Sequence, residues 1–309
     1  MRHSRLIALY LLAVPTFAPA CCGVTNPGKR VNFLSQTNII VWNPETKTEQ
    51  FIRKAWFSSN GQALGFVAPT PTKPELDEVD ESIINLFNSL RPQPKSPPAS
   101  GGLGGFGGGG GVQVLEEKEV AGFDATVLKA DDQNALYDWL LAHEFENSEN
   151  ITKWAAQYIA KKWILTIFKV NVRNGSAKTK LVRMTFKTDQ PYNPYVVPSA
   201  NISQEKAVRT GLMIYFVGPG IYDVERKPWN SSLKIELEAR MTDSFRETLA
   251  KLVKLDPEVP EYGITAFLDY GFPVRNAPDD LWFNRVAPVP EPLVQWAKDF
   301  ANKKSSSLR

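Results

Sequence analysis

The sequence predicts an α+β fold in which antiparallel sheets, built from meanders and hairpins, pack against a few helices. Short strand-like runs separated by turn signals carry the first part of this prediction, as where Asn38–Trp42 and Glu49–Phe57 flank an Asn-Pro turn. Apolar residues at helical spacing carry the second part, as between Asp131 and His143. With 309 residues and 43% hydrophobic content, the chain can bury a large core as one domain or as two.

The first twenty residues have the three-part form of an export signal. Arg2 and Arg5 supply a positive start, an apolar run from Leu6 to Val14 follows, and Ala18-Pro19-Ala20 matches the small-residue motif of signal cleavage. We therefore expect residues 1–20 to be a signal peptide and the mature protein to lie outside the cytoplasm.

Cys21 would then be the first residue of the mature chain, and two interpretations of it stay open. It is either the attachment point of a lipid or the ordinary first residue of a secreted protein. Ala18 and Pro19 fit a lipoprotein signal poorly and an ordinary signal well, which favours the second interpretation. Cys22 is the only other cysteine, so no disulfide framework can staple the core.

The charge balance and the apolar runs exclude two classes of protein. Removing residues 1–20 would leave 34 basic and 33 acidic residues, which lacks the positive footprint of nucleic-acid-binding proteins. The longest later apolar run, Gly211–Gly218, is far shorter than the roughly twenty residues of a membrane helix. We expect no nucleic-acid partner, no transmembrane helix after signal removal, and a location in the periplasm, on the cell surface or in the medium.

Residues 21–91 are expected to form an N-terminal β-meander followed by a helix. Three strand-like runs should pair in chain order: Asn38–Trp42, Glu49–Phe57 and Ala63–Val67. A proline-spaced stretch from Pro69 to Pro74 then takes the chain out of the sheet along a polyproline II path. Three aromatic residues are assigned to the core or a sheet face rather than to a ligand platform: Trp42, Phe51 and Trp56.

Four of the acidic residues that follow these prolines gather near the start of a predicted helix: Asp77, Glu78, Asp80 and Glu81. They suit the positive end of a helix dipole, and Val79–Leu90 has the apolar spacing of a helix. A calcium loop is the alternative, but it needs oxygen ligands at fixed alternate positions around a glycine turn, which Leu76–Ser82 lacks. The helix start is therefore favoured.

The composition changes abruptly at residues 92–111, a tract rich in proline and then in glycine. Such a tract cannot bury enough apolar surface to offset the entropy of ordering it, so we expect a flexible linker or loop. A phosphate-binding loop is disfavoured because no Lys-Ser/Thr pair follows Gly111. Beyond the tract we assign a C-terminal α+β domain, residues 112–302, and a loose tail, residues 303–309.

The C-terminal segment should contain strands on both sides of two amphipathic helices. Strand-like runs at 112–119 and 122–129 precede a helix capped by Asp131 or Asp132, and a second helix begins near Asn150. Further elements are expected as follows: a strand buried on both faces at Trp163–Val170, its hairpin partner Leu181–Lys187, strands at Leu212–Val217, Leu233–Ala239 and Ile264–Asp269, and helices near Asp243 and Val294–Ala301. Pro191, Pro194 and Pro198 repeat the exit at Pro69 in outline, which is consistent with a duplicated module.

Four sequence blocks carry a resemblance to a known family: FVAPTPTKPELDEVD, GFDATVLKADDQNALYDWLLAHEF, WAAQYIAKKWILTIFKVNV and MTFKTDQPYNPYVVPS. With the export signal followed by Cys21-Cys22-Gly23, they resemble the successive blocks of the bacterial family catalogued as domain of unknown function 2330 (DUF2330). The resemblance covers almost the whole mature chain. It implies an envelope or secreted location and supplies no activity, so there is no catalytic residue to carry over.

The residues themselves name no catalytic, cofactor-binding or metal-ligating site. His143 would be the only histidine left after signal removal, on the core-facing edge of a helix, where a structural role is favoured over a nucleophilic relay. Three or four His/Cys ligands for zinc cannot be assembled. Asp131-Asp132 and Asp279-Asp280 fall where helix caps and turns place acids.

Two functional hypotheses follow. The first is a non-catalytic envelope module that binds an envelope macromolecule, protein or glycan, through exposed proline stretches and tryptophans. The second is a glycan hydrolase that uses two carboxylates, which would need two acids about 5 to 10 Å apart in a cleft beside exposed aromatic residues. The absence of any assembled nucleophile or metal set favours the first.

Overall fold

The structure is a computed structural model, which describes residues 23–25, 31–59, 63–90, 112–143, 145, 148–171, 180–198, 210–226, 232–236, 243–255, 262–272, 277 and 279–289. Its helices are α1 (Ser82–Ser89), α2 (Gln133–Ala142), α3 (Ser148–Ala160) and α4 (Asp243–Val253). Its strands are β1 (Gly23–Thr25), β2 (Val31–Asn43), β3 (Thr48–Ser59), β4 (Ala63–Thr70), β5 (Glu75–Val79), β6 (Val112–Val120), β7 (Phe123–Ala130), β8 (Ile164–Asn171), β9 (Leu181–Lys187), β10 (Tyr192–Asn193), β11 (Thr210–Gly218), β12 (Ile221–Val224), β13 (Ser232–Glu236), β14 (Gly263–Phe272) and β15 (Leu281–Ala287).

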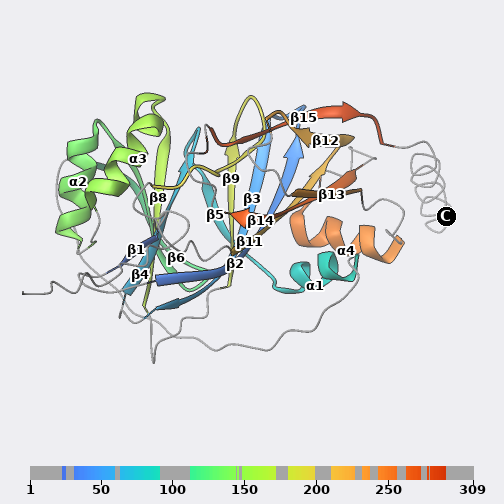
Figure 1. Cartoon of the computed structure of the whole chain (residues 1–309), viewed down its shortest axis with the longest axis horizontal. Helices are drawn as coiled ribbons and strands as arrows, with labels where there is room; N and C mark the ends of the chain where they lie inside the picture. The colour runs from blue at the N-terminus through green and yellow to red at the C-terminus, as the bar shows by residue number, and fades with distance from the viewer. Residues whose placement is uncertain are drawn as a thin grey trace, which may run out of the picture.

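The largest sheet has seven strands in the order β13-β14-β11-β2-β3-β9-β5. All of its pairings are antiparallel except that of β2 with β11, which is parallel. β2 and β3 form the long hairpin that the sequence predicts. Helices α1 and α4 contact each other and lie together on one side of this sheet (Figure 1).

Alternation along the central strands gives the seven-stranded sheet two buried faces. Ile39, Val41 and Ile52 belong to a core cluster that also contains buried side chains of α1 and α4. Their neighbours Ile40 and Phe51 belong to a second cluster, which extends to the other sheet. Because successive side chains of a strand point to opposite faces, a fully apolar run such as this one places the strand in the middle of a layered structure.

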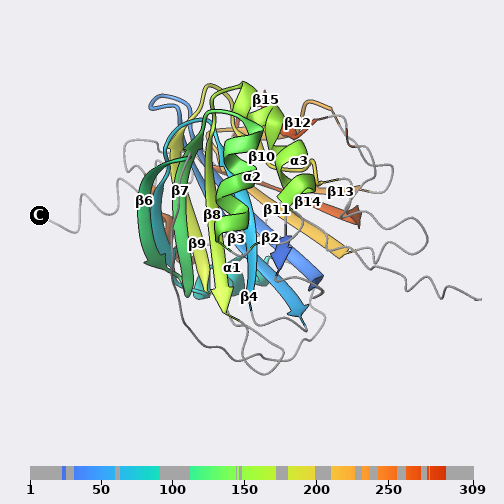
Figure 2. The same cartoon turned by 90° about the vertical axis from the view of Figure 1, so that its left-hand side faces the viewer.

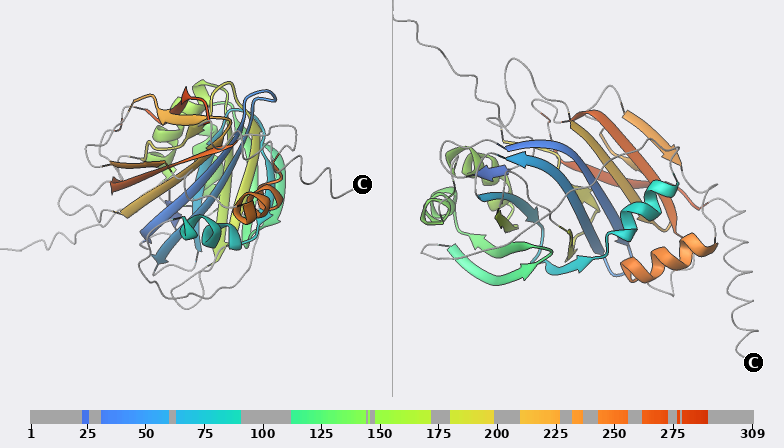
Figure 3. Two further views of the ribbon diagram at one scale, coloured as in Figure 1. Left: turned by 90° about the vertical axis from the view of Figure 1, so that its right-hand side faces the viewer. Right: turned by 90° about the horizontal axis from the view of Figure 1, so that it is seen from below.

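The second sheet has five strands in the order β1-β4-β8-β7-β6. Phe66 stacks on Phe168 with ring centroids 4.6 Å apart, and Arg53 of the large sheet lies 4.2 Å from the Phe66 ring centroid, so this face packs against the seven-stranded sheet. Helices α2 and α3 lie at this end of the molecule, away from α1 and α4 (Figures 2 and 3). A small third sheet, β10-β15-β12, completes the fold. The predicted α+β class with mostly antiparallel sheets is confirmed.

Two predicted strand pairings are wrong. β4 does not continue the β2–β3 meander but lies between β1 and β8 in the five-stranded sheet. β8 and β9 are not a hairpin, since β8 pairs with β4 and β7 while β9 pairs with β3 and β5. The strands before residue 92 and those after residue 111 therefore share both large sheets. Burial of β8 on both faces explains why it pairs with β4 and β7. A strand buried in this way needs a neighbouring strand on each edge and packed elements against each face.

The assignment of Asp77 and Glu78 to the start of a helix at Val79–Leu90 is also wrong, because α1 begins only at Ser82. Residues Glu75–Val79 form the edge strand β5, in which Leu76 and Val79 are buried and Asp77 lies opposite Arg183 of β9. Pairing with β9 therefore prevails over the local preference for a helix. Asp80 still acts at the true start of α1, where its side chain accepts a hydrogen bond of 2.8 Å from the Ser82 N–H.

Several predictions lie outside the described residues. These are the signal peptide, Cys21 and Cys22, the tract 92–111, the Asn174-Gly175 turn, residues 237–239 of a predicted strand, the helix at Val294–Ala301 and the tail 303–309. The side chain of Trp56 falls in the same group. Within the described ranges, no helix is both long enough and apolar enough to cross a membrane.

Candidate functional site: a buried carboxylate cluster

The segment from Thr188 to Pro198 has no long regular structure and, after the exposed Asp189, enters the interior. Tyr192 and Tyr195 are each 1% exposed, and Pro191 is buried. A buried backbone must satisfy its N–H groups, and proline has none. The prolines of this segment therefore reduce the number of backbone donors that need a partner. The N–H groups of Tyr192, Tyr195 and Val196 donate to the side chains of two buried acids.

Glu49 is the first of these acids. It lies in β3 with no exposed surface, and its Oε2 accepts a hydrogen bond of 2.9 Å from the Tyr192 N–H. Its Oε1 has no hydrogen-bond partner within the part of the chain that the structure describes. Burial raises the pKa of Glu49 well above its ordinary value, and the bond from Tyr192 opposes this only partly.

Asp280, just before β15, is the second buried acid, and it accepts more hydrogen bonds than Glu49 does. Its Oδ1 accepts the N–H groups of Tyr195 at 2.8 Å and Val196 at 3.0 Å, while the Tyr158 hydroxyl of α3 lies 2.9 Å from Oδ2. Burial raises its pKa to about 6, against the lowering effect of the three donors, and the neighbouring charge of Asp279 adds to the rise. Asp280 therefore joins α3, the buried segment and β15.

Side chains of the segment extend the cluster to other strands. The Tyr195 hydroxyl donates to Asp269 of β14 at 2.7 Å, and the Tyr192 hydroxyl donates to the carbonyl of Pro69 in β4. Burial, followed by the charges of Glu49 and Asp280, raises the pKa of Tyr192 well above its ordinary value. The cluster thus connects both large sheets through one irregular segment.

Perturbed acids in a protein interior are candidates for catalysis, and the hydrolase hypothesis needs two of them facing a sugar beside exposed aromatic rings. Here the carboxyl groups face protein donors, and the surrounding rings pack on each other: Trp163 lies 5.1 Å and Trp282 5.3 Å from Tyr192 between centroids. Among the described residues, no three His, Cys, Asp or Glu side chains are grouped as a metal site requires. The arrangement fastens the segment in place.

Sequence reasoning missed both acids. The sequence predicts a turn at Asp279-Asp280, and the chain does bend at Asp279, whose side chain accepts the Asp280 N–H at 2.8 Å. Asp280 itself, however, is only 6% exposed. Glu49 did carry a signal, because two-residue spacing puts it on the same strand face as Phe51, a predicted core residue. In the other acidic pair, Asp131-Asp132, the side chain of Asp132 caps α2 as expected by accepting hydrogen bonds from the N–H groups of Asn134 and Ala135.

His143 occupies the C-terminal end of α2, where its ring stacks on Trp139 with centroids 3.7 Å apart. Its Nδ1 lies 2.6 Å from the Trp139 carbonyl oxygen, which assigns the proton of this hydrogen bond to Nδ1. No carboxylate or hydroxyl contact of a relay accompanies it in the described structure. The geometry is that of a helix-end contact.

Replacing His143 with glutamine should therefore lower the free energy of unfolding by about 1 kcal/mol, through loss of ring stacking and a changed hydrogen bond. Urea denaturation followed by tryptophan fluorescence measures this. An unchanged midpoint together with loss of an enzymatic turnover would contradict the structural role.

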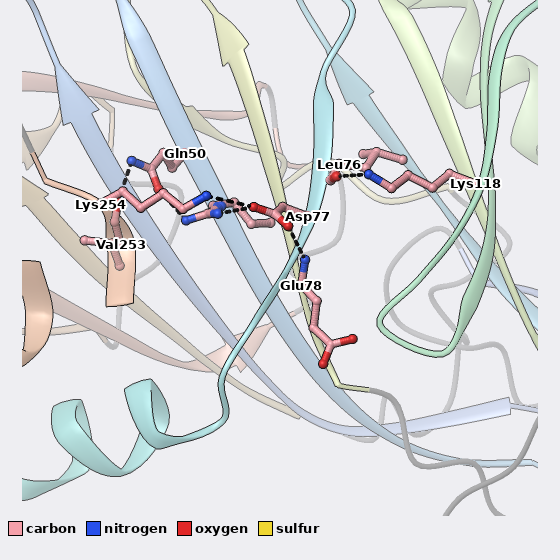
Figure 4. Close-up of polar contacts among 8 residues, drawn as sticks. Gln50, Leu76, Asp77, Glu78, Lys118, Val253 and Lys254 are labelled. Carbon is pink, nitrogen blue, oxygen red and sulfur yellow. Dashed lines mark hydrogen bonds and ion pairs between the residues drawn. The ribbon is translucent and has the colours of Figure 1, made fainter. Parts of the chain in front are cut away.

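The acidic stretch after Pro74 is distributed among separate basic partners. Arg183 and Lys254 both contact Asp77, the latter at 3.3 Å, while Lys180 pairs with Glu78 at 2.6 Å. Burial alone would raise the pKa of Asp77, but the hydrogen bonds and charges of Arg183 and Lys254 lower it overall. Figure 4 shows the contacts of Asp77 and, beside them, the Gln50 side chain, whose amide donates to the Val253 carbonyl at the end of α4. These contacts dock α4 on the sheet.

Several of the tryptophans and prolines expected to form an exposed binding surface are buried instead. Trp42, Trp139 and Trp154 are at most 6% exposed, which confirms a core position for Trp42 and removes these rings from the surface. Pro69 and Pro191 are buried as well. Pro288 is exposed and Trp282 is half-buried, so a binding surface can draw on only part of the predicted residues.

Comparisons with known proteins give one family and one distant structure. The model of a family described as an uncharacterized protein conserved in bacteria, DUF2330, matches residues 15–217. No curated protein matches the chain. A crystal structure of a mutated baculovirus P35 after caspase cleavage, at 2.7 Å resolution, matches with a TM-score of 0.31 and 6% identity, over 65% of this chain and 76% of that one. Because the family model spans well over half of the sequence, the chain belongs to the bacterial family DUF2330.

Proposed function

We propose that this protein is a non-catalytic module of the bacterial cell envelope, exported from the cytoplasm, which binds an envelope protein or glycan. The observation that carries the proposal is that the two buried acids bind the protein's own backbone. Glu49 and Asp280 accept hydrogen bonds from the Thr188–Pro198 segment and hold it in the core, which is a structural task. The export signal at residues 1–20 and the bacterial family support the location.

The alternative is a glycan hydrolase that depends on two carboxylates. Its chemistry requires a general acid and a second carboxylate that reach the scissile bond. Among the described residues, the acids with raised pKa values are Glu49 and Asp280, and the hydrogen bonds that they accept come from groups inside the protein. No described feature favours this alternative over the binding module.

The test is to express the full chain in a bacterium, isolate it from the extracytoplasmic fraction, and mix it with purified peptidoglycan and with envelope extract. We expect an intact mass that begins at Cys21 without diacylglycerol, co-sedimentation with an envelope component, and no release of reducing ends above a heat-denatured control. Retention in the cytoplasm would overturn the location, and glycan cleavage would overturn the non-catalytic role.

A further inference from the structure

Strand β6 is the outermost strand of the five-stranded sheet (Figure 2). Within the described part of the chain it forms a ladder with β7 alone, over Val112 to Val120. The backbone N–H and C=O groups on its other side therefore lack a strand partner there. Such an edge can accept an added strand from another chain.

The inner face of β6 is already occupied. Lys118 and Glu116 lie opposite Ala125 and Val127, which are buried between the sheets, so the two side chains point inward. Lys118 Nζ donates to the Leu76 carbonyl of β5 at 2.7 Å (Figure 4), and Glu116 pairs with Lys73 at 2.8 Å. These side-chain contacts hold β5 beneath β6, while β5 forms its own ladder with β9.

The outer face and both ends of β6 carry negative charge. Residues 112–143 contain seven acidic residues and two lysines, in a chain whose net charge is +3. Glu117 and Glu119 are exposed on the strand, and Asp131 is exposed near the end that begins at Val112. None of these three carboxylates forms an ion pair with a described residue. Val114, 42% exposed, adds an apolar side chain to the same strand.

This charge decides between two classes of occupant. Two copies of β6 would bring glutamates against glutamates, which disfavours self-pairing. A segment rich in lysine or arginine would instead meet complementary charge along the strand, which favours its encounter and its register.

We propose that β6 is a docking edge for a cationic, extended peptide segment of a partner protein, which adds to the five-stranded sheet as a sixth strand. The proposal rests on the binding function proposed above and specifies its partner chemistry. Main-chain hydrogen bonds along β6 supply the contact, while Glu117 and Glu119 select lysine or arginine at alternate positions.

The test uses the mature protein and three synthetic nine-residue peptides: one with alternating lysine and valine, the same peptide with alternate backbone nitrogens methylated, and a glutamate–valine version. Fluorescence anisotropy measures affinity at low and high salt, and amide hydrogen exchange locates the contact. We expect the lysine peptide to bind and to slow exchange in β6, with affinity falling as salt screens the charges. The methylated and glutamate peptides should each bind about tenfold more weakly or worse, because one lacks the ladder donors and the other the charge.

Two matched variants separate the edge from general surface charge. Glu119→Lys on β6 should weaken binding of the lysine peptide about tenfold at low salt, whereas Glu247→Lys, the same change at another exposed glutamate, on α4, should leave its affinity unchanged. Equal losses in both variants, equal binding of the methylated peptide, or protection outside β6 would each overturn the docking edge. If the peptide fails while the protein still co-sediments with envelope, only this inference falls; glycan cleavage would instead remove the proposed function.

Discussion

Replacing Asp280 with alanine is expected to lower the free energy of unfolding by about 3 to 5 kcal/mol, because it removes the acceptor of several buried donors at once. The N–H groups of Tyr195 and Val196 and the hydroxyl of Tyr158 all bond to this carboxyl group. Left in a dry interior without an acceptor, each donor retains its full desolvation cost. Urea denaturation followed by circular dichroism at pH 7 measures the loss.

Asp280→Asn is the matched control. The amide oxygen can accept both backbone N–H groups that now bond to Oδ1, so we expect this variant to stay within about 1 kcal/mol of the wild type. Equal damage from asparagine and alanine would show that the carboxylate charge, and not its acceptor geometry, holds the segment. A mild effect of alanine would contradict the fastening role.

The second large effect concerns pH, and its sign is opposite to ordinary acid denaturation. Burial raises the pKa of Asp280 from 3.8 to about 6, so between these values the folded protein holds a proton that the unfolded chain has released. Stability must then fall as pH rises through this window and stay lower above it. For this group alone the free energy of unfolding should be about 2 kcal/mol lower at pH 7.5 than at pH 4.5.

Glu49 acts in the same direction, since burial raises its pKa too. Asp77 acts in the opposite direction below about pH 4, because its lowered pKa adds stability that acid removes. The check is a series of urea titrations from pH 4.5 to 7.5 on the wild type and on Asp280→Asn, in which the Asp280 contribution should disappear. A wild-type curve that rises over this range would refute the assignment of a raised pKa to Asp280.

Local features of the sequence predicted most elements and few of their partners. The cap at Asp132, the apolar faces of α2 and α3, and the alternation in β2 and β3 depend on residues within one or two turns of each other, and they are found where expected. The order of the strands in a sheet instead depends on which strand faces are buried by other elements of the fold. β8 is buried on both sides, and nothing in its own spacing says that β4, about one hundred residues earlier, is its neighbour.

In the carboxylate cluster, too, one residue could be predicted from local sequence and the other depends on distant partners. Glu49 stands at an inward position of an alternating strand, so its burial could be read locally. Asp280 depends on Tyr158, 122 residues away in the sequence, and on backbone groups of the Thr188–Pro198 segment, so a turn-like Asp-Asp pair gave no indication of its role. β5 shows the reverse case, in which a distant partner, Arg183, draws Asp77 into a strand against a helix-like local pattern.

The shared sheets also determine when this chain can fold during its synthesis. β2 and β3 emerge early from the ribosome, yet β2 needs β11, Thr210–Gly218, on its free edge, and β3 needs β9. Until β9 and then β11 have been made, the hairpin edges on β3 and on β2 therefore stay open. Such non-local pairing closes slowly and exposes strands to aggregation. We expect a chaperone that binds unfolded chains to bind this hairpin. A chain truncated before β11 should not form the central sheet.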